Sequence, residues 1–262
     1  MITGELSTNI PLLREKLKTL SPTMTLLPKI EDIINKEEPT LEDILKVCSH
    51  DTKLLGKLTR RSGFSGSEQE FAQDILFKKG LGFLKSLAIR SMNQEIFEVP
   101  MPNSSLTPTL LKKRSVVLAR FIKSFAPDIG IGLDEAYLTG LLFNYGYVCY
   151  EIAYDSLGSE IPDFQENRSH YDKCASELLS EFGFAKVVCE VIEDANCEFY
   201  QTRLPFAQAL LRIANETLSN NEQSHGTIGR GEKPDSMLVD ATGMRVRKIF
   251  AVLKDISRNY SS

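Results

Sequence analysis

The chain has 262 residues, of which 42% are hydrophobic and 25% are charged, and its formal net charge at pH 7 is −4. This is the composition of an ordinary globular protein with room for one or two hydrophobic cores, so a folded chain is the expectation. Only three histidines and five cysteines are present, and any site that needs several nitrogen or sulfur ligands therefore has few candidates.

No segment has the properties of a membrane span or a secretory signal. The longest stretch without a formal charge, 136–150, has 15 residues, whereas a transmembrane helix needs about 20 apolar residues. We therefore expect a cytoplasmic protein that makes no membrane contact. Because the number of cysteines is odd and no CxxC pair occurs, we expect free, mostly buried thiols.

The charges are unevenly distributed along the chain. Residues 50–125 contain 13 basic and 6 acidic side chains, and residues 126–200 contain 3 basic and 15 acidic ones. Two solvated surfaces of opposite sign that face water or each other explain this pattern, and a basic face for an anionic partner is the alternative. Aromatic residues are few in the basic segment, so nucleic-acid binding is not expected.

Apolar residues recur three and four positions apart along most of the chain, which predicts an all-α fold. The first apolar stripes predict an N-terminal helical bundle and lie at 30–34, 41–47, 54–58 and 81–92. Thr40 and Asp43 form a variant capping box before the second stripe. Pro100 and Pro102 disfavour helix, so the segment 99–105 is the expected subdomain boundary.

Helices are also predicted beyond this boundary. Thr107 caps a helix with Pro108 in its first turn. Asp134 opens another, which continues through the apolar run 138–150 and is expected at the centre of the fold. Further helices end at Gly183, cover 187–192 and begin at Pro205. Residues 219–236, rich in Asn, Ser, Gly and charge, predict a mobile loop before a short terminal helix.

Several motifs occur in the order typical of a known family. They are Leu26-Leu27-Pro28, Thr40 to Ile44, Ser49-His50-Asp51, the run 75–97 around Lys79 to Leu84, and Ala136 to Gly146, whose sequence AYLTGLLFNYG looks like the family's AFLAGLLHDIG. Over residues 24–215 the chain resembles the HDOD family, which comprises bacterial signalling domains related to the HD phosphohydrolases. The resemblance implies a helical bundle at 24–100 packed on an HD-like core at 107–215. Residues 1–23 are then an N-terminal segment, and 216–262 are a loop and a C-terminal helix.

In the catalytic HD superfamily, a His-Asp pair with further histidines and an aspartate holds one or two metal ions, which activate water and neutralise phosphate. Here the matching positions carry other residues, namely Arg114, Phe143, Asn144, Tyr171, Ala195, Asn196 and Asn215. A phenyl ring cannot ligate a metal, a neutral amide is a poor substitute for carboxylate, and a permanent cation repels one. His170 is a candidate ligand only if the alignment shifts by one residue.

Three functions follow from this pattern. The first is a non-catalytic regulatory protein that needs no cofactor and acts in bacterial signal transduction through protein contacts, with self-association as an option. The second is a residual metal-dependent phosphohydrolase that uses His170 and acidic residues. The third is a nucleotide or anion receptor formed by Arg114, Asn144, Tyr171 and Asn196. Since helical spacing places Arg114 on an apolar stripe, a structural ion pair is the plainer role for its side chain.

Overall fold

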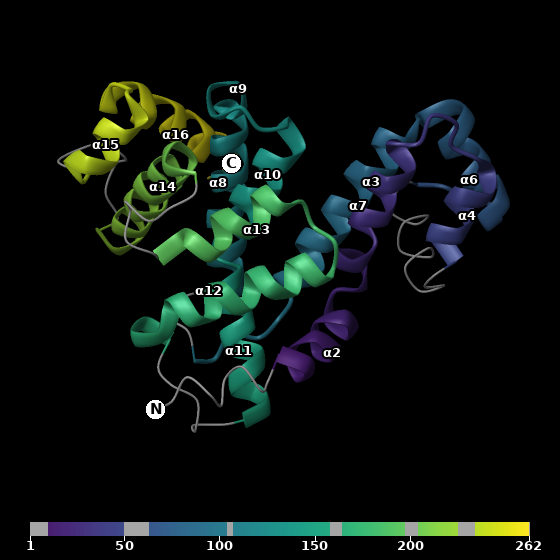
Figure 1. The fold of residues 1–262 in the computed structure, drawn as a ribbon, viewed down its shortest axis with the longest axis horizontal. Helices are drawn as coiled ribbons and strands as arrows, with labels where there is room; N and C mark the ends of the chain where they lie inside the picture. The colour runs from purple at the N-terminus through teal and green to yellow at the C-terminus, as the bar shows by residue number, and fades with distance from the viewer. Residues whose placement is uncertain are drawn as a thin grey trace.

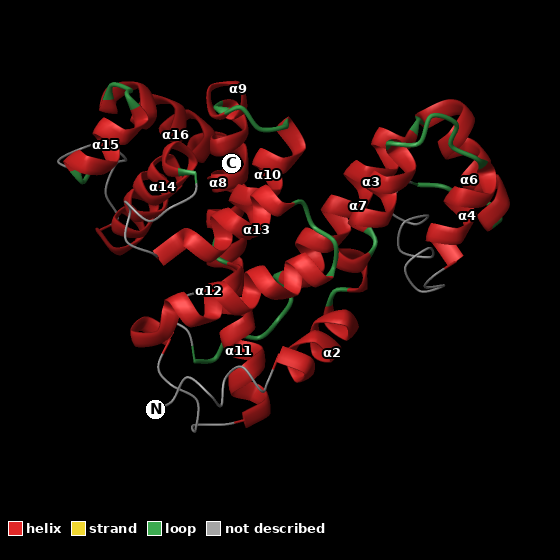
Figure 2. Ribbon diagram, in the orientation of Figure 1, coloured by secondary structure: helices red, strands yellow, loops and turns green. Residues whose placement is uncertain are grey.

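The computed structural model describes residues 10–49, 63–103, 107–157, 164–196, 204–224 and 234–261. Within these ranges every regular element is a helix, as Figure 2 shows, so the all-α prediction is confirmed. The apolar stripe at 54–58 and the dipeptide His50-Asp51 lie outside the described residues. No helix in the described ranges is both long and apolar enough to cross a membrane.

The described part of the N-terminal half starts at residue 10, inside the segment 1–23 that was expected to precede the helical bundle. It consists of α2 (Ile10–Leu20), a 3-10 turn (Pro22–Thr25), α3 (Leu27–Ile34), α4 (Leu41–Ser49), α6 (Glu68–Asp74), a π-helical turn (Ile75–Lys79) and α7 (Leu81–Ile96). Figure 1 shows α3, α4, α6 and α7 as a lobe on one side of the molecule, whereas α2 lies beside α11.

The predicted capping box at the start of α4 is confirmed. The backbone N–H of Asp43 donates to Thr40 Oγ1 (3.2 Å), and the backbone N–H of Thr40 donates to Asp43 Oδ2 (3.0 Å). Lys36 also bonds the carboxylate, and Lys36 together with Thr40 lowers the pKa of Asp43 to about 2. Asp43 therefore stays ionised and satisfies backbone donors that a helix start would otherwise leave open.

A buried carboxylate attaches the 3-10 turn to α7. Glu95 is buried and accepts hydrogen bonds from Thr23 Oγ1 (2.8 Å), the Thr23 backbone N–H (3.2 Å) and Ser21 Oγ (3.2 Å). These donors compensate for the water that the carboxylate loses on burial. The chain that leads from α2 into the lobe is thus fixed at the base of the lobe.

The C-terminal half starts at its predicted cap, where Thr107 Oγ1 accepts the backbone N–H of Leu110 (3.2 Å). Its elements are α8 (Pro108–Ser124), α9 (Ala126–Ile129), α10 (Leu133–Leu142), α11 (Tyr145–Leu157), α12 (Phe164–Glu181), α13 (Lys186–Glu193), a 3-10 turn (Asp194–Asn196), α14 (Pro205–Ser224), α15 (Ser236–Thr242) and α16 (Val246–Ser261). Figure 1 shows α14, α15 and α16 gathered on the side away from the N-terminal lobe.

Two predicted elements differ from the structure. The helix expected from Asp134 through the run 138–150 is interrupted at Phe143 and Asn144, which separate α10 from α11. The loop expected at 219–236 is also wrong in its first part, because α14 continues to Ser224; residues 225–233 lie outside the described residues. Leu218 is buried in the core, and such packing stabilises a helix end that composition alone disfavours.

Buried apolar side chains form two clusters that share α8. The first cluster extends from Met24, Ile30 and Leu84 in the N-terminal half to Leu141 and Leu178 in the C-terminal half. The second cluster joins α8 to α13, α14, α15 and α16. Hydrophobic packing therefore connects the two halves of the chain.

Helices α8 and α10 approach each other to backbone contact at Gly140. A Cβ atom at this position would lie 2.5 Å from the carbonyl oxygen of Leu118 and 2.6 Å from the Cα atom of Ala119. Only glycine allows this distance without movement of a backbone. The close packing brings the turn that follows α10, with Asn144, into the interior.

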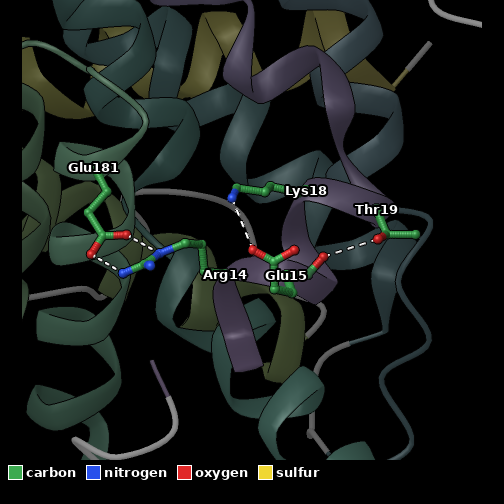
Figure 3. A network of polar contacts seen from close by, with 5 residues as sticks. All are labelled: Arg14, Glu15, Lys18, Thr19 and Glu181. Carbon is green, nitrogen blue, oxygen red and sulfur yellow. Dashed lines mark hydrogen bonds and ion pairs between the residues drawn. The ribbon is translucent and has the colours of Figure 1, made fainter. Parts of the chain in front are cut away.

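Ion pairs join cations of the N-terminal half to the acidic segment 126–200, and one of these cations, Lys85, belongs to the basic segment 50–125. Figure 3 shows the guanidinium of Arg14 on α2 bonded to both carboxylate oxygens of Glu181 on α12. Similarly, Lys16 Nζ lies 3.1 Å from Asp155 Oδ2, and Lys85 Nζ lies 2.7 Å from Asp134 Oδ2. Cations of the N-terminal half thus face carboxylates of the acidic segment.

Candidate functional site

The turn between α10 and α11 carries a buried pair of asparagines. Asn144 Nδ2 donates a hydrogen bond to Asn215 Oδ1 on α14, at 3.0 Å, and both side chains are buried. These residues are 71 positions apart in the chain. The structure therefore brings together two of the positions at which the HDOD resemblance implies lost metal ligands.

A guanidinium completes this polar cluster. Arg168 on α12 donates from Nη2 to Asn144 Oδ1 (3.3 Å), and its Nε lies 3.5 Å from Asp172 Oδ2. The Cζ atom of Arg168 is 5.5 Å from the centroid of the Tyr147 ring, a distance that permits a cation–π contact. Arg168 thus contacts an amide, a carboxylate and an aromatic ring.

Glycine 146 makes room for the carboxylate of this cluster. A Cβ atom on Gly146 would lie 2.2 Å from Asp172 Oδ1, so the start of α11 rests directly on the carboxylate. Asp172 is fully buried, and a buried carboxylate needs a nearby cation or several donors. Arg168, four residues earlier on the same helix, supplies that cation.

The other expected site residues have different surroundings from the asparagine pair. Phe143 and Ala195 are buried in the second hydrophobic cluster, and the Tyr171 ring packs edge-on against Tyr150 at a centroid distance of 5.1 Å. The side chain of Asn196 lies outside the described residues. Phe143 and Ala195 thus contribute to hydrophobic packing, and the ring of Tyr171 belongs to an aromatic pair.

Arg114 is buried on α8 and takes part in an interaction within the chain. Leu118 packs on Gly140, and the short connection between α8 and α10 makes an antiparallel pair of the two helices. Arg114 lies one turn before Leu118 on the same helix and is 5% exposed.

His170 faces a different environment from Asn144. Its Nε2 atom lies 3.4 Å from Cys174 Sγ, and its ring stacks edge-on with Tyr171. Burial lowers the pKa of His170, against an opposing effect of Glu177 and with a smaller contribution from Lys173. Within the described parts of the chain, no group of three or more His, Cys, Asp or Glu side chains is placed to hold a metal ion.

The side chains around Asn144 do not fit a divalent metal. Hard cations need several oxygen ligands with negative charge among them, and transition metals need imidazole or thiolate. Here the amide groups of Asn144 and Asn215 bond each other, and the remaining oxygen of Asn144 accepts from Arg168. The carboxylate of Asp172 is already paired with that guanidinium.

Sequence reasoning missed Arg168 and Asp172, although both carry a recognisable signal. Their spacing of four residues suits an ion pair on one helix face. Arg168 is also one of only three basic residues in the acidic segment 126–200. A basic residue in a segment with many carboxylates is a good candidate for one member of a structural ion pair.

Comparisons with known proteins give one relevant finding. No family model matches the chain, and no curated protein matches it at a significant level. The crystal structure of a protein from Shewanella amazonensis SB2B, described as a "putative phosphohydrolase", is similar with a TM-score of 0.52 and 15% sequence identity over 98% of each chain. The two chains share a fold. Because the identity is low, this likeness concerns the arrangement of helices.

Proposed function

We propose that this chain is a non-catalytic regulatory protein of the HDOD type, which acts in signal transduction through contacts with other proteins. The proposal rests on the cluster of Asn144, Asn215 and Arg168. At the place where an HD phosphohydrolase would hold metal, the chain has two neutral amides and a cation. The helical arrangement shared with the Shewanella protein is compatible with an origin from a phosphohydrolase fold.

Electrostatics explains why this cluster opposes catalysis. The guanidinium of Arg168 and the carboxylate of Asp172 compensate each other, so the cluster offers a divalent ion no net negative charge. The neutral amides of Asn144 and Asn215 add none. The guanidinium instead takes the structural place of a metal charge, because it neutralises Asp172 and orients Asn144.

Close packing around the cluster favours a scaffold over a receptor. Phe143 and Tyr145, on either side of Asn144, are 1% and 2% exposed. The hydroxyl of Tyr145 donates to Met24 Sδ at 3.5 Å, which ties the turn to the N-terminal half. An enzyme of this kind needs space for a phosphate beside the ligands, whereas these rings fill the surroundings of Asn144.

Metal analysis and hydrolase assays of the purified chain test the absence of catalysis. The protein is loaded with Mn²⁺, Mg²⁺, Fe²⁺ or Zn²⁺, desalted and analysed for bound metal, and bis-p-nitrophenyl phosphate and p-nitrophenyl phosphate are offered as substrates. We expect less than stoichiometric metal and no turnover above the buffer rate. Stoichiometric metal with turnover that EDTA abolishes would instead identify a residual phosphohydrolase.

Binding measurements separate the regulatory role from the receptor role. Phosphate and nucleotides are titrated against the parent chain and Arg114→Gln, and light scattering gives the oligomeric state. The regulatory role predicts no saturable binding of these anions to either protein. Saturable binding that Arg114→Gln abolishes would support the anion receptor in its place.

A further inference from the structure

Phe77, which follows α6, is an aromatic side chain that is left almost entirely in water. It is 76% exposed, the highest value among the large hydrophobic residues that are exposed in the described part of the chain; the others are Leu20, Leu133 and Met237. Contact between water and a phenyl ring is unfavourable, and burial of the ring against a partner removes this cost. Phe77 is therefore a candidate for a contact residue.

A π-helical turn with fixed ends presents this ring. The turn spans Ile75–Lys79, and the backbone N–H of Gly80 donates to the carbonyl oxygen of Ile75 at 2.7 Å. Ile75 is fully buried, and Lys79 Nζ lies 3.2 Å from Asp74 Oδ2. Turns of this kind are frequent at functional sites. A ring that is already held on a fixed turn also loses little conformational freedom when it binds.

The exposed charge beside the ring is positive. Lys78 and Lys79 share one carboxylate, that of Asp74, at 3.4 and 3.2 Å. The Lys78 side chain is 78% exposed, whereas that of Asp74 is 11% exposed. The turn thus presents an aromatic ring with a cation next to it. Its complement is an apolar hollow with an exposed carboxylate at the rim.

A cavity between α2, residues 99–103 and α11 has this form. Its volume is about 400 Å³, and an apolar cavity of about 150 Å³ already accommodates a benzene ring. The apolar residues of its lining are Leu20, Val99, Pro100, Pro102, Ile152 and Tyr154. Leu20 is 40% exposed, so an apolar occupant would cover a side chain that water now contacts.

The rim of this cavity carries an exposed carboxylate. The Asp155 side chain is 81% exposed, and Lys16 Nζ lies 3.1 Å from its Oδ2 atom. A carboxylate has about four acceptor positions, so a second lysine can approach it from the solvent side. The most exposed charges of the turn and of the cavity rim are thus opposite in sign.

The ring and the cavity belong to different parts of the molecule. Figure 1 shows α6, which leads directly into the π-helical turn, at the end of the N-terminal lobe that is remote from α2 and α11. Helices α3 and α7 lie between them in this view. The ring cannot reach the cavity of its own chain while the lobe is folded, so a contact between them joins two copies.

We propose that Phe77 of one copy of the chain inserts into the cavity between α2 and α11 of a second copy, with Lys78 beside Asp155. This contact is independent of the proposed regulatory function. One aromatic ring buries about 150–250 Å², far less than the 1,200 Å² or so that specific, stable complexes bury. The association is therefore weak, reversible and dependent on protein concentration.

Sedimentation velocity over a series of concentrations measures this association. We expect the parent chain to be monomeric at about 10 µM and to form dimers or larger species at about 1 mM. Phe77→Asp removes the ring and places a negative charge opposite Asp155, so it should raise the dissociation constant at least about tenfold. A parent chain that stays monomeric, or a Phe77→Asp protein that associates as the parent does, would overturn the proposal.

A matched control separates the ring from the change in net charge. Met237 on α15 is also an exposed apolar residue, at 57%, and Met237→Asp introduces the same charge as Phe77→Asp. We expect it to change the dissociation constant less than about twofold. Equal losses in the two variants would assign the effect to net charge and refute the role of Phe77.

A mixture of two defective variants tests whether the ring enters this cavity. Leu20→Trp adds bulk at a partly exposed wall position, so we expect a protein that is folded by circular dichroism and does not self-associate. Phe77→Asp keeps the cavity and Leu20→Trp keeps the ring, so their equimolar mixture should form one-to-one complexes. Normal self-association of folded Leu20→Trp, or a mixture that stays monomeric, would contradict insertion into this cavity.

Discussion

At the residue scale, the main feature is a guanidinium that connects the α10–α11 turn to α12. Arg168 connects Asn144 of the α10–α11 turn to Asp172 of α12. The side chain of Arg168 is 18% exposed and that of Asp172 is 1% exposed. Their interaction is consequently screened much less than an ion pair on the surface.

Replacement of this arginine is expected to destabilise the fold. Arg168→Met removes the charge beside buried Asp172 and the donor to Asn144, and we expect it to lower the free energy of unfolding by about 3 kcal/mol. Arg168→Lys keeps the charge but lacks the planar set of donors with which the guanidinium contacts both Asn144 and Asp172. We therefore expect it to lower the free energy of unfolding by less than Arg168→Met does. Urea denaturation followed by circular dichroism measures both. A loss below about 0.5 kcal/mol for Arg168→Met would show that Asp172 does not depend on this partner.

The sequence allowed part of this site to be predicted. Resemblance to the HDOD pattern pointed to Asn144 and Asn215, which do meet in the structure. It did not predict that Tyr171 packs on Tyr150, because alignment to a ligand position says nothing about which way a helix face turns. Nor did it reveal Arg168, whose role depends on the break between α10 and α11.

At the element scale, the break between α10 and α11 shows where tertiary contacts override the helical pattern of the sequence. The run 138–150 is apolar on most sides, and periodicity alone extends one helix through it. The structure ends α10 at Leu142 and restarts at Tyr145, where Asn144 has partners on two other helices. Asparagine side chains favour such turns because they compete with helical hydrogen bonds. By contrast, caps such as Thr40 and Thr107 depend on neighbours only three residues away and were predictable.

The contact between α8 and α10 gives a sharp prediction about glycine. Gly140→Ala forces a methyl group into the backbone of Leu118 and Ala119, and we expect destabilisation by about 1–3 kcal/mol. Gly82→Ala is the matched control, because a Cβ atom at Gly82 meets nothing within 4 Å in α7. That change should be neutral or stabilising by up to about 1 kcal/mol. Thermal and urea unfolding compare the two, and equal effects would mean that α10 can move away from α8.

At the scale of the whole molecule, burial of thiols predicts a pH dependence of stability. Burial raises the pKa of Cys174 and that of Cys189 to about 11 each, from an ordinary value of 9.0. Between these values the unfolded chain loses protons that the folded chain retains, so the unfolded state is favoured as the pH rises. We expect the free energy of unfolding to be unaffected by these thiols below pH 9 and to fall between about pH 9 and 11.

A double variant isolates this contribution of the cysteines. Cys174→Ala with Cys189→Ala removes both thiols but keeps Tyr145, whose pKa is raised by burial and which also titrates at high pH. The decline in stability between about pH 9 and 11 should be shallower in the variant than in the parent chain. Identical slopes in urea titrations across this range would exclude the thiols as its source.

The sharing of α8 by both hydrophobic clusters has a consequence for how the molecule opens. Leu111, Val116 and Ala119 of this helix belong to one cluster, and Val117, Leu118 and Phe121 belong to the other. Loss of packing in either cluster removes contacts from α8. Partial unfolding of one cluster therefore weakens the other. The amide protons of α8 should therefore exchange with deuterated solvent only through global unfolding, whereas those at the far end of the N-terminal lobe, in α4 and α6, exchange through smaller local openings.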